Sequence, residues 1–212
     1  MMLPAAQVSA QRINEVLETR NSLTQGARID ALETGTVEFR DVSFHYPSSD
    51  KNVLEHITFQ AKRGETVAFI GATGSGKTYL ACALGMAAAR RFYAVKYIRL
   101  PDLLVEFQIA RGNGTIRKFM AQYRKYALLI IDEWLLYPLK ETEARDLLEI
   151  VESRYKRNST IFCSQFDIPG WPEKLSDPLL ADAICDRIVH DAYTIVIGGK
   201  ESMRKRKGLQ DI

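Results

Sequence analysis

Residues 69–85 read FIGATGSGKTYLACALG, and this stretch decides the fold class. The segment from Gly71 to Thr78 satisfies the pattern G-x-x-x-x-G-K-[ST]. A continuous apolar run, TVAFI, ends just before it at Ile70, and an alanine-rich helical pattern opens at Thr78. A glycine turn between a buried strand and a helix N-terminus wraps phosphate groups with backbone amides. The alternative is a glycine turn without a ligand, but the flanking strand and helix favour a P-loop and predict ATP binding.

The P-loop assigns a role to each of its members. We expect Lys77 to reach the β- and γ-phosphates of ATP and the Thr78 hydroxyl to bind Mg²⁺. The glycines let the backbone approach the phosphates closely. The predicted nucleotide-binding residues are Gly71, Ala72, Thr73, Gly74, Ser75, Gly76, Lys77 and Thr78.

The second half of such a site is an acidic residue at the end of a buried strand. The run ALLIIDEW, residues 127–134, supplies Asp132 and then Glu133 after five apolar residues. We expect Asp132 to hold Mg²⁺, directly or through water, and Glu133 to act as the general base on the attacking water. Acidic pairs after strands also serve as helix caps, but the upstream P-loop favours a site for nucleotide hydrolysis.

The pattern of apolar residues changes at the P-loop. Before it come a helical stripe over 5–20 and three strand-like runs, 36–44, 53–61 and 66–70. After it, helical patterns alternate with short apolar strands, which predicts a parallel sheet covered on both faces. We therefore expect an α/β P-loop NTPase fold with an N-terminal helix and a small antiparallel β unit. The predicted divisions are 1–35 (helix and linker), 36–70 (β strands) and 71–212 (ATPase core with a basic tail).

Downstream of the loop, the segments GKTYLACALG, KYIRLPDLL, LLIIDEWLLYPL, EARDLLEIVESRY, STIFCSQF and ADAICDRIVHDAYTI resemble the IstB-type transposition helper ATPases. These are AAA+ relatives of the DnaC-type helicase loaders. The resemblance implies that Gln165 is a polar sensor of the γ-phosphate. It also implies that Arg187 is offered to the nucleotide of a neighbouring subunit, and hence that the protein is a homo-oligomer. The alternative for Arg187 is an ordinary salt bridge on the helix surface.

Upstream, the segments AAQVSAQRINEVLET and GTVEFRDVSFHYPSSDKNVLEHITFQAKRGETVAFIGATGSGKT resemble an ABC exporter. That resemblance implies that Tyr46 stacks on adenine and that the chain is a fusion with its junction at Thr78 and Tyr79. No glutamine loop, LSGGQ-like signature or switch histidine follows residue 78. Transport is therefore not the expected function.

The charge of the chain is unevenly distributed. Residues 1–70 carry a net charge of −2, and residues 71–212 carry +5, concentrated at 116–126 and 204–207. Such clusters can bind the phosphates of nucleic acid, although a solvated helix face and a polar tail are the simpler explanation. The three cysteines and three histidines are scattered, which favours inert thiols and no metal cluster. With no apolar run long enough to span a bilayer and no signal peptide, we expect a cytoplasmic protein without membrane contact.

The combined prediction is an ATPase that uses ATP and Mg²⁺. It would assist DNA transposition as an oligomer on double-stranded DNA, together with a transposase. Two alternatives stay open: an ATP-binding fragment of an ABC transporter, and a recombined or misassembled reading frame that only binds nucleotide.

Overall fold

The computed structural model describes residues 36–45, 52, 54–189 and 192–197. The chain divides into two compact units, residues 1–33 and 34–212, and every described residue belongs to the second. The helix expected over 5–20, the adenine-stacking Tyr46 and the basic cluster at 204–207 lie outside the described residues.

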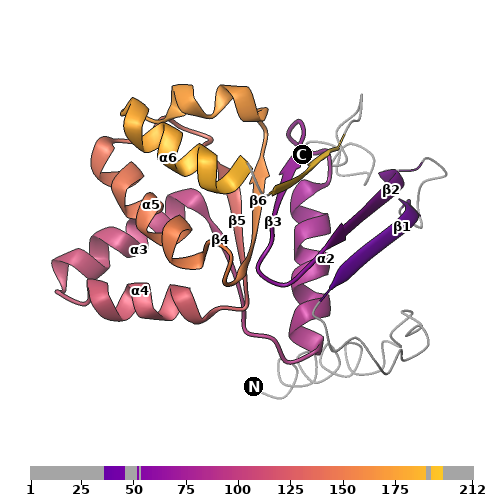
Figure 1. The fold of residues 1–212 in the computed structure, drawn as a ribbon, viewed down its shortest axis with the longest axis horizontal. Helices are drawn as coiled ribbons and strands as arrows, with labels where there is room; N and C mark the ends of the chain where they lie inside the picture. Colours follow the sequence, from indigo (N-terminus) through magenta and orange to yellow (C-terminus); the bar gives the residue numbers. More distant parts are fainter. Residues whose placement is uncertain (1–35, 46–51, 53, 190–191, 198–212) are drawn as a thin grey trace, which may run out of the picture. The chain divides into compact units, whose positions relative to one another are not determined.

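A five-stranded parallel sheet forms the centre of the second unit (Figure 1). Its strand order is β4-β5-β6-β3-β7, and all four neighbouring pairs run parallel. The strand that leads into the P-loop and the strand that carries Asp132 are therefore separated by β6. The strands are β3 (Thr66–Ile70), β4 (Val95–Arg99), β5 (Leu128–Trp134), β6 (Ser159–Ser164) and β7 (Ala192–Val196). The sheet confirms the predicted α/β class.

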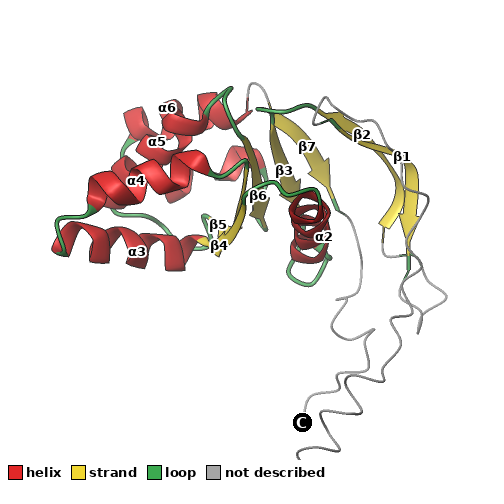
Figure 2. Ribbon diagram, turned by 90° about the horizontal axis from the view of Figure 1, so that it is seen from below, coloured by secondary structure: helices red, strands yellow, loops and turns green. Residues whose placement is uncertain are grey.

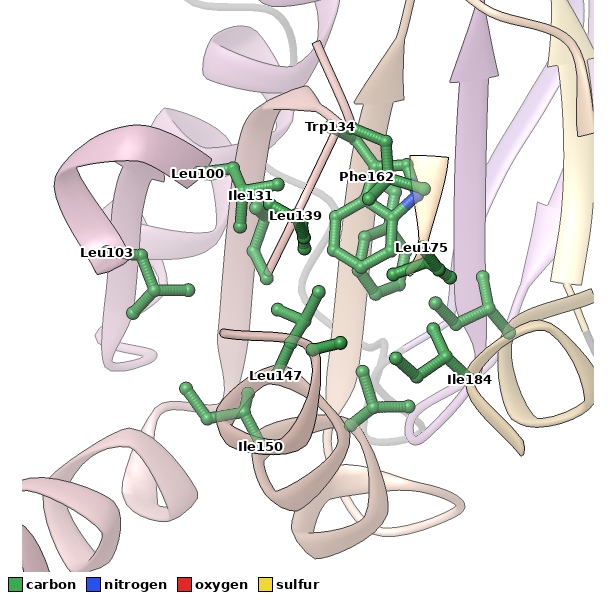
Figure 3. Packing of buried hydrophobic residues seen from close by; sticks show 14 of the residues in the cluster. Leu100, Leu103, Ile131, Trp134, Leu139, Leu147, Ile150, Phe162, Leu175 and Ile184 are labelled. Carbon is green, nitrogen blue, oxygen red and sulfur yellow. The ribbon is translucent and has the colours of Figure 1, made fainter. Parts of the chain in front are cut away.

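Four helices cover one face of this sheet (Figure 2). Alternate strand residues, including Ile131 and Phe162, point to this side and pack against Leu103, Leu147 and Ile184 of the helices (Figure 3). Because side chains alternate along a strand, every second residue of each strand faces these helices. Together with the helix residues they form one continuous core layer. The helices are α3 (Leu100–Gly112), α4 (Ile116–Lys125), α5 (Glu141–Arg154) and α6 (Pro178–Val189), with 3₁₀ turns at Ile168–Gly170 and Pro172–Lys174.

The opposite face is covered differently. Here helix α2 (Lys77–Arg90) is joined by a separate antiparallel pair, β1 (Val37–Phe44) and β2 (Leu54–Ala61). Strand β2 buries its alternate side chains in the same cluster as Phe69 and Ile130 of the sheet. Within the described residues, the predicted antiparallel strands thus pack on this face of the sheet and share its core.

Small residues let α2 lie close to the sheet. Ala81 is fully buried, and a Cβ at Gly85 would stand 2.9 Å from the Cδ1 atom of Ile130. The alanine-rich composition of this helix therefore matches its position against β5. Close packing brings the first turn of α2 to the carboxyl ends of the strands, where the P-loop lies.

Candidate nucleotide-binding site

The P-loop connects Ile70, the last residue of β3, to Lys77, the first residue of α2. Gly74 and Gly76 adopt φ angles of 81° and 100°, in the left-handed region that favours glycine. Gly71 is required for a different reason, because a Cβ there would stand 2.5 Å from the carbonyl oxygen of Ile197. The loop geometry therefore depends on glycine at all three positions.

The side chain of Lys77 lies inside the loop and is only 8% exposed. Its Nζ donates hydrogen bonds to the carbonyl oxygens of Gly71 at 2.5 Å and Ala72 at 2.8 Å, and to the Ser75 hydroxyl at 3.4 Å. Burial lowers the pKa of Lys77, while the nearby Cys163 and Asp132 act in the opposite direction. The loop thus holds an ammonium group against two backbone carbonyl oxygens and one hydroxyl, and a positive charge in such a loop suits a phosphate chain.

Thr78 and Asp132 meet across the gap between α2 and β5. The Thr78 hydroxyl donates to Oδ2 of Asp132 at 2.7 Å, although the two residues lie 54 positions apart in the chain. The backbone N–H of Glu133 donates to Oδ1 at 2.8 Å. The two residues expected to share Mg²⁺ are therefore adjacent.

Glu133 adopts an unusual backbone conformation, with a φ of 54°. The pairing of β5 with β6 is interrupted at this point, between Ile131 and Trp134. Positive φ values in residues other than glycine are uncommon and are found at active sites. The Glu133 side chain is 36% exposed, and its Oε1 lies 3.9 Å from a guanidinium nitrogen of Arg99. The carboxylate is therefore open to solvent at the end of the strand.

Gln165 follows β6 directly and contacts the P-loop. Its Oε1 accepts a hydrogen bond from the Thr73 hydroxyl at 2.7 Å. The preceding residue, Ser164, is fully buried, and its hydroxyl accepts hydrogen bonds from the Phe166 backbone and the Trp171 indole. The polar residue expected to sense the γ-phosphate therefore lies beside the loop on a well-anchored strand end.

Arg187 lies apart from this cluster. It pairs with Glu152 at 2.7 Å and donates to the Ala183 carbonyl oxygen at 2.9 Å. It lines the same small cavity as Thr66, at the start of β3, whereas the P-loop follows the end of that strand. Arg187 thus forms the surface salt bridge that we named as the alternative, and its position does not serve the P-loop of its own chain.

Tyr97 is a site residue that the sequence did not reveal. It lies on β4, and its hydroxyl donates to Oδ2 of Asp132 at 2.9 Å. Burial and this hydrogen bond raise the pKa of the Tyr97 phenol, so it stays protonated at neutral pH. The bond depends on the register between β4 and β5, which no local pattern around residue 97 encodes.

The oxygen ligands fit magnesium better than a metal of the zinc type. Mg²⁺ is held by one or two protein oxygens together with phosphates and waters. The Thr78 hydroxyl and the Asp132 carboxylate provide such oxygens beside the loop. In the described part of the chain, no group of three or more His, Cys, Asp or Glu side chains could hold a metal ion. The same residues include no helix that is long and apolar enough to cross a membrane.

Comparison with known families places this geometry in context. The family model described as IstB-like ATP binding protein matches residues 12–211. The chain belongs to this family. The protein y4uH of Sinorhizobium fredii, named as a putative insertion sequence ATP-binding protein, is 44% identical over 183 residues. That match covers 80% of this chain and 73% of y4uH. Three such relatives are covered over 58 to 73% of their length.

The fold of this IstB-like protein is also seen in solved structures. DnaI has a TM-score of 0.58 and 23% identity, and the match covers 65% of this chain and 77% of DnaI. A separate similarity reaches the ABC transporter ATP-binding protein YfiB of Bacillus subtilis, with 44% identity over 80 residues. It covers 38% of this chain and 14% of YfiB. The IstB-like model runs through the expected junction at Thr78, so the comparisons establish the family and do not show a fusion.

Proposed function

We propose that this chain binds and hydrolyses ATP with Mg²⁺. In this proposal it assists transposition as an oligomer on double-stranded DNA, together with a transposase. The main support is the 2.7 Å hydrogen bond between Thr78 and Asp132, which joins the P-loop to the acidic strand end. Relatives named as insertion-sequence ATP-binding proteins support the biological setting.

Nucleotide binding requires a rearrangement of Lys77. Its ammonium group would exchange the carbonyl oxygens of Gly71 and Ala72 for the β- and γ-phosphate oxygens, which carry more negative charge. The backbone amides at the start of α2 would face the same anion. Thr78 and Asp132 would hold Mg²⁺, which supplies charge neutralisation at the phosphates when bound.

Hydrolysis would depend on Glu133. Its partly exposed carboxylate would accept a proton from a water molecule while the water oxygen forms a bond to the γ-phosphorus. The bond between the γ-phosphorus and the bridging oxygen then breaks, and ADP leaves with the electron pair. Gln165 would exchange its bond to Thr73 for one to the γ-phosphate, and in this way report which nucleotide is bound.

Oligomer formation would give Arg187 its role. Its position near the start of β3 suits a partner's nucleotide rather than its own. To reach a partner, the guanidinium would have to leave Glu152. An arginine supplied in trans neutralises charge in the transition state and accelerates phosphoryl transfer.

DNA binding is supported by helix α4. Its sequence, IRKFMAQYRK, contains four basic residues and no acidic one, and all four basic side chains are exposed. Met120 and Tyr123 are buried and anchor the opposite side of the helix. Exposed basic residues on an anchored helix suit contacts to the phosphate backbone, which carry no base specificity.

The ABC-like origin of the N-terminal segment is a separate proposal. Its support is the resemblance of residues 36–78 and the 80-residue similarity to YfiB. Under this proposal Tyr46 would stack on adenine. Sequencing the source DNA across codons 70–85 tests whether the reading frame is continuous, and a break there would favour the misassembled frame.

The decisive experiment measures ATPase activity with and without duplex DNA, over a range of salt concentrations. We expect turnover that rises with DNA, and a DNA affinity that falls steeply from about 50 to about 200 mM salt. Lys77→Ala should lose nucleotide binding, whereas Glu133→Gln should keep binding and lose about 10²–10⁴-fold in turnover. Binding without turnover in the unmodified chain would instead favour a protein that only binds nucleotide. Turnover without a DNA response would contradict the helper function.

A further inference from the structure

Both carboxylate oxygens of Asp132 have hydrogen-bond donors, and the donors come from three different segments. Oδ1 accepts from the Glu133 backbone at 2.8 Å. Oδ2 accepts from two hydroxyl groups, Thr78 at 2.7 Å and Tyr97 at 2.9 Å. The two donors to Oδ2 therefore approach it from α2 on one side and from β4 on the other.

Tyr97 reaches Asp132 because of where β4 lies in the sheet. Strand β4 lies at one edge of the sheet, and Tyr97 pairs with Ile130 of β5 in the parallel register. Ile130 belongs to the core layer on the α2 side, and Asp132 follows it two residues later on the same face of the strand. The length of the tyrosine side chain spans this offset, so its hydroxyl lies at the carboxyl end of β5. A phenylalanine would fill the same space without reaching the carboxylate.

The two donors differ in what they could do when a metal ion binds. Thr78 would bind the ion through its own oxygen, so its orientation follows the metal. Tyr97 is neither one of the residues expected to bind the phosphates nor one of the expected Mg²⁺ ligands. Its hydroxyl can therefore keep donating to Asp132 when the ion is bound. Magnesium demands near-ideal octahedral geometry, so the orientation of a carboxylate that serves it matters for affinity. Outer hydrogen bonds of this kind fix the orientation of ligating groups.

We propose that Tyr97 is a positioning residue for magnesium, which holds the Asp132 carboxylate in the orientation that the ion requires. This inference rests on the proposed function, because it assumes that Mg²⁺ and ATP occupy the site. Removing the hydroxyl should raise the Mg²⁺ concentration at the midpoint of the stabilisation about tenfold. Loss of an outer hydrogen-bond partner of a metal ligand typically lowers metal affinity by about 10- to 100-fold, so this is the smaller end of that range. Binding of the nucleotide without the metal should not change, since Tyr97 donates its hydrogen bond to Asp132 and not to the P-loop residues that would hold phosphate.

The test compares the full-length chain with Tyr97→Phe. Thermal melts with a non-hydrolysable ATP analogue are recorded while Mg²⁺ is titrated, and the Mg²⁺ midpoint of the rise in melting temperature is measured. Binding of a fluorescent ATP analogue in EDTA gives the affinity without metal. Tyr93→Phe is the matched control, because Tyr93 precedes the same strand and is exposed to 42%, close to the 41% of Tyr97. Tyr97→Leu provides a second variant that also lacks the hydroxyl.

We expect both Tyr97 variants to shift the Mg²⁺ midpoint upward about tenfold. Their ligand-free melting temperature and their affinity in EDTA should match those of the unmodified chain and Tyr93→Phe. An unchanged midpoint in Tyr97→Phe, with a normal response in the unmodified chain, would overturn this inference and leave the proposed function intact. A midpoint shift accompanied by an equal loss of affinity in EDTA would point to a general structural defect and would also overturn it. Absence of any Mg²⁺-dependent response in the unmodified chain would overturn the proposed function as well.

Discussion

Gly71 and Gly112 differ in what surrounds them, although both are glycines beside helices of the same α/β unit. A Cβ at Gly71 would stand 2.5 Å from the backbone oxygen of Ile197, whereas nothing lies within 4 Å of a Cβ at Gly112. We expect Gly71→Ala to cost about 1–3 kcal/mol of folding free energy because backbone must move. Gly112→Ala, at the end of α3, should be neutral or stabilising by up to ~1 kcal/mol. Urea unfolding of the two variants measures both values, and equal effects would contradict the packing described for the P-loop.

Residues of the site differed in how well the sequence revealed them. Lys77, Thr78 and Asp132 could be proposed as site residues because their identities and spacing within short segments carry the signal, and the structure places Thr78 beside Asp132. Tyr97 could not, because its bond to Asp132 depends on the register of two strands that are distant in the chain. The pairing of Arg187 with Glu152 likewise arises from the packing of α6 on α5. Local patterns therefore predicted the elements and the motifs, while contacts between elements required the fold.

The β1–β2 pair shows the same limit at the level of elements. Its alternating sequence predicted two strands, but it did not determine which surface they would cover. In the fold, β2 buries Leu54, Phe59 and Ala61 on the α2 side of the sheet. Phe59 also stacks on Phe39 of β1, with ring centroids 4.7 Å apart. The pair is therefore part of the core layer.

This packing predicts that the β1–β2 pair unfolds together with the parallel sheet and its helices. Phe59→Ala should lower the free energy of unfolding by about 3–5 kcal/mol, because it removes a buried aromatic ring. Val37→Ala, at a position that is 41% exposed, should change it far less and serves as the control. Denaturant unfolding followed by fluorescence of the buried Trp134 and Trp171 measures both. If Phe59→Ala leaves the transition of these tryptophans unchanged, the strand pair is not coupled to the core.

Helix α4 is held in place by a buried arginine. Arg154 is 2% exposed and donates to the carbonyl oxygens of Tyr123, Tyr126 and Ser159. Burial lowers the pKa of Arg154 to about 10, so the group is still charged at neutral pH. These bonds fix the C-terminal end of α4 against the start of β6. The backbone that carries the basic side chains of α4 is therefore held in place by these hydrogen bonds.

Reversing charge on this helix should weaken DNA binding without affecting nucleotide binding. The double variant Arg117→Glu and Lys118→Glu should reduce the slope of log K against log salt by about 0.9 for each DNA phosphate that the helix no longer neutralises. Arg90→Glu with Arg91→Glu, at the exposed end of α2, changes the net charge equally and is the control. Fluorescence anisotropy with labelled duplex DNA measures the slope. Equal effects of the two double variants would mean that the net charge alone governs DNA binding, and that α4 is not the DNA-contacting surface.

At the scale of the whole molecule, the separation of Arg187 from the P-loop leads to a prediction about pairs of subunits. Lys77→Ala should lack a working nucleotide site but still supply its arginine, and Arg187→Ala should have the opposite defect. In an equal mixture of the two variants, roughly a quarter of head-to-tail interfaces would combine an intact P-loop with an intact arginine. ATPase activity should therefore recover in the mixture, although each variant alone should be inactive.

The salt bridge to Glu152 provides the control for this mixing experiment. Because Arg187 would have to leave Glu152 to reach a partner, Glu152→Ala should release the arginine and maintain or raise turnover. If Arg187 were only a structural salt-bridge residue, Glu152→Ala and Arg187→Ala would instead have similar effects on stability, and neither would reduce turnover selectively. A mixture no more active than its separate components would equally argue against an arginine supplied in trans. Loss of turnover in Arg187→Ala but not in Glu152→Ala, together with recovery in the mixture, would assign Arg187 to the neighbouring site.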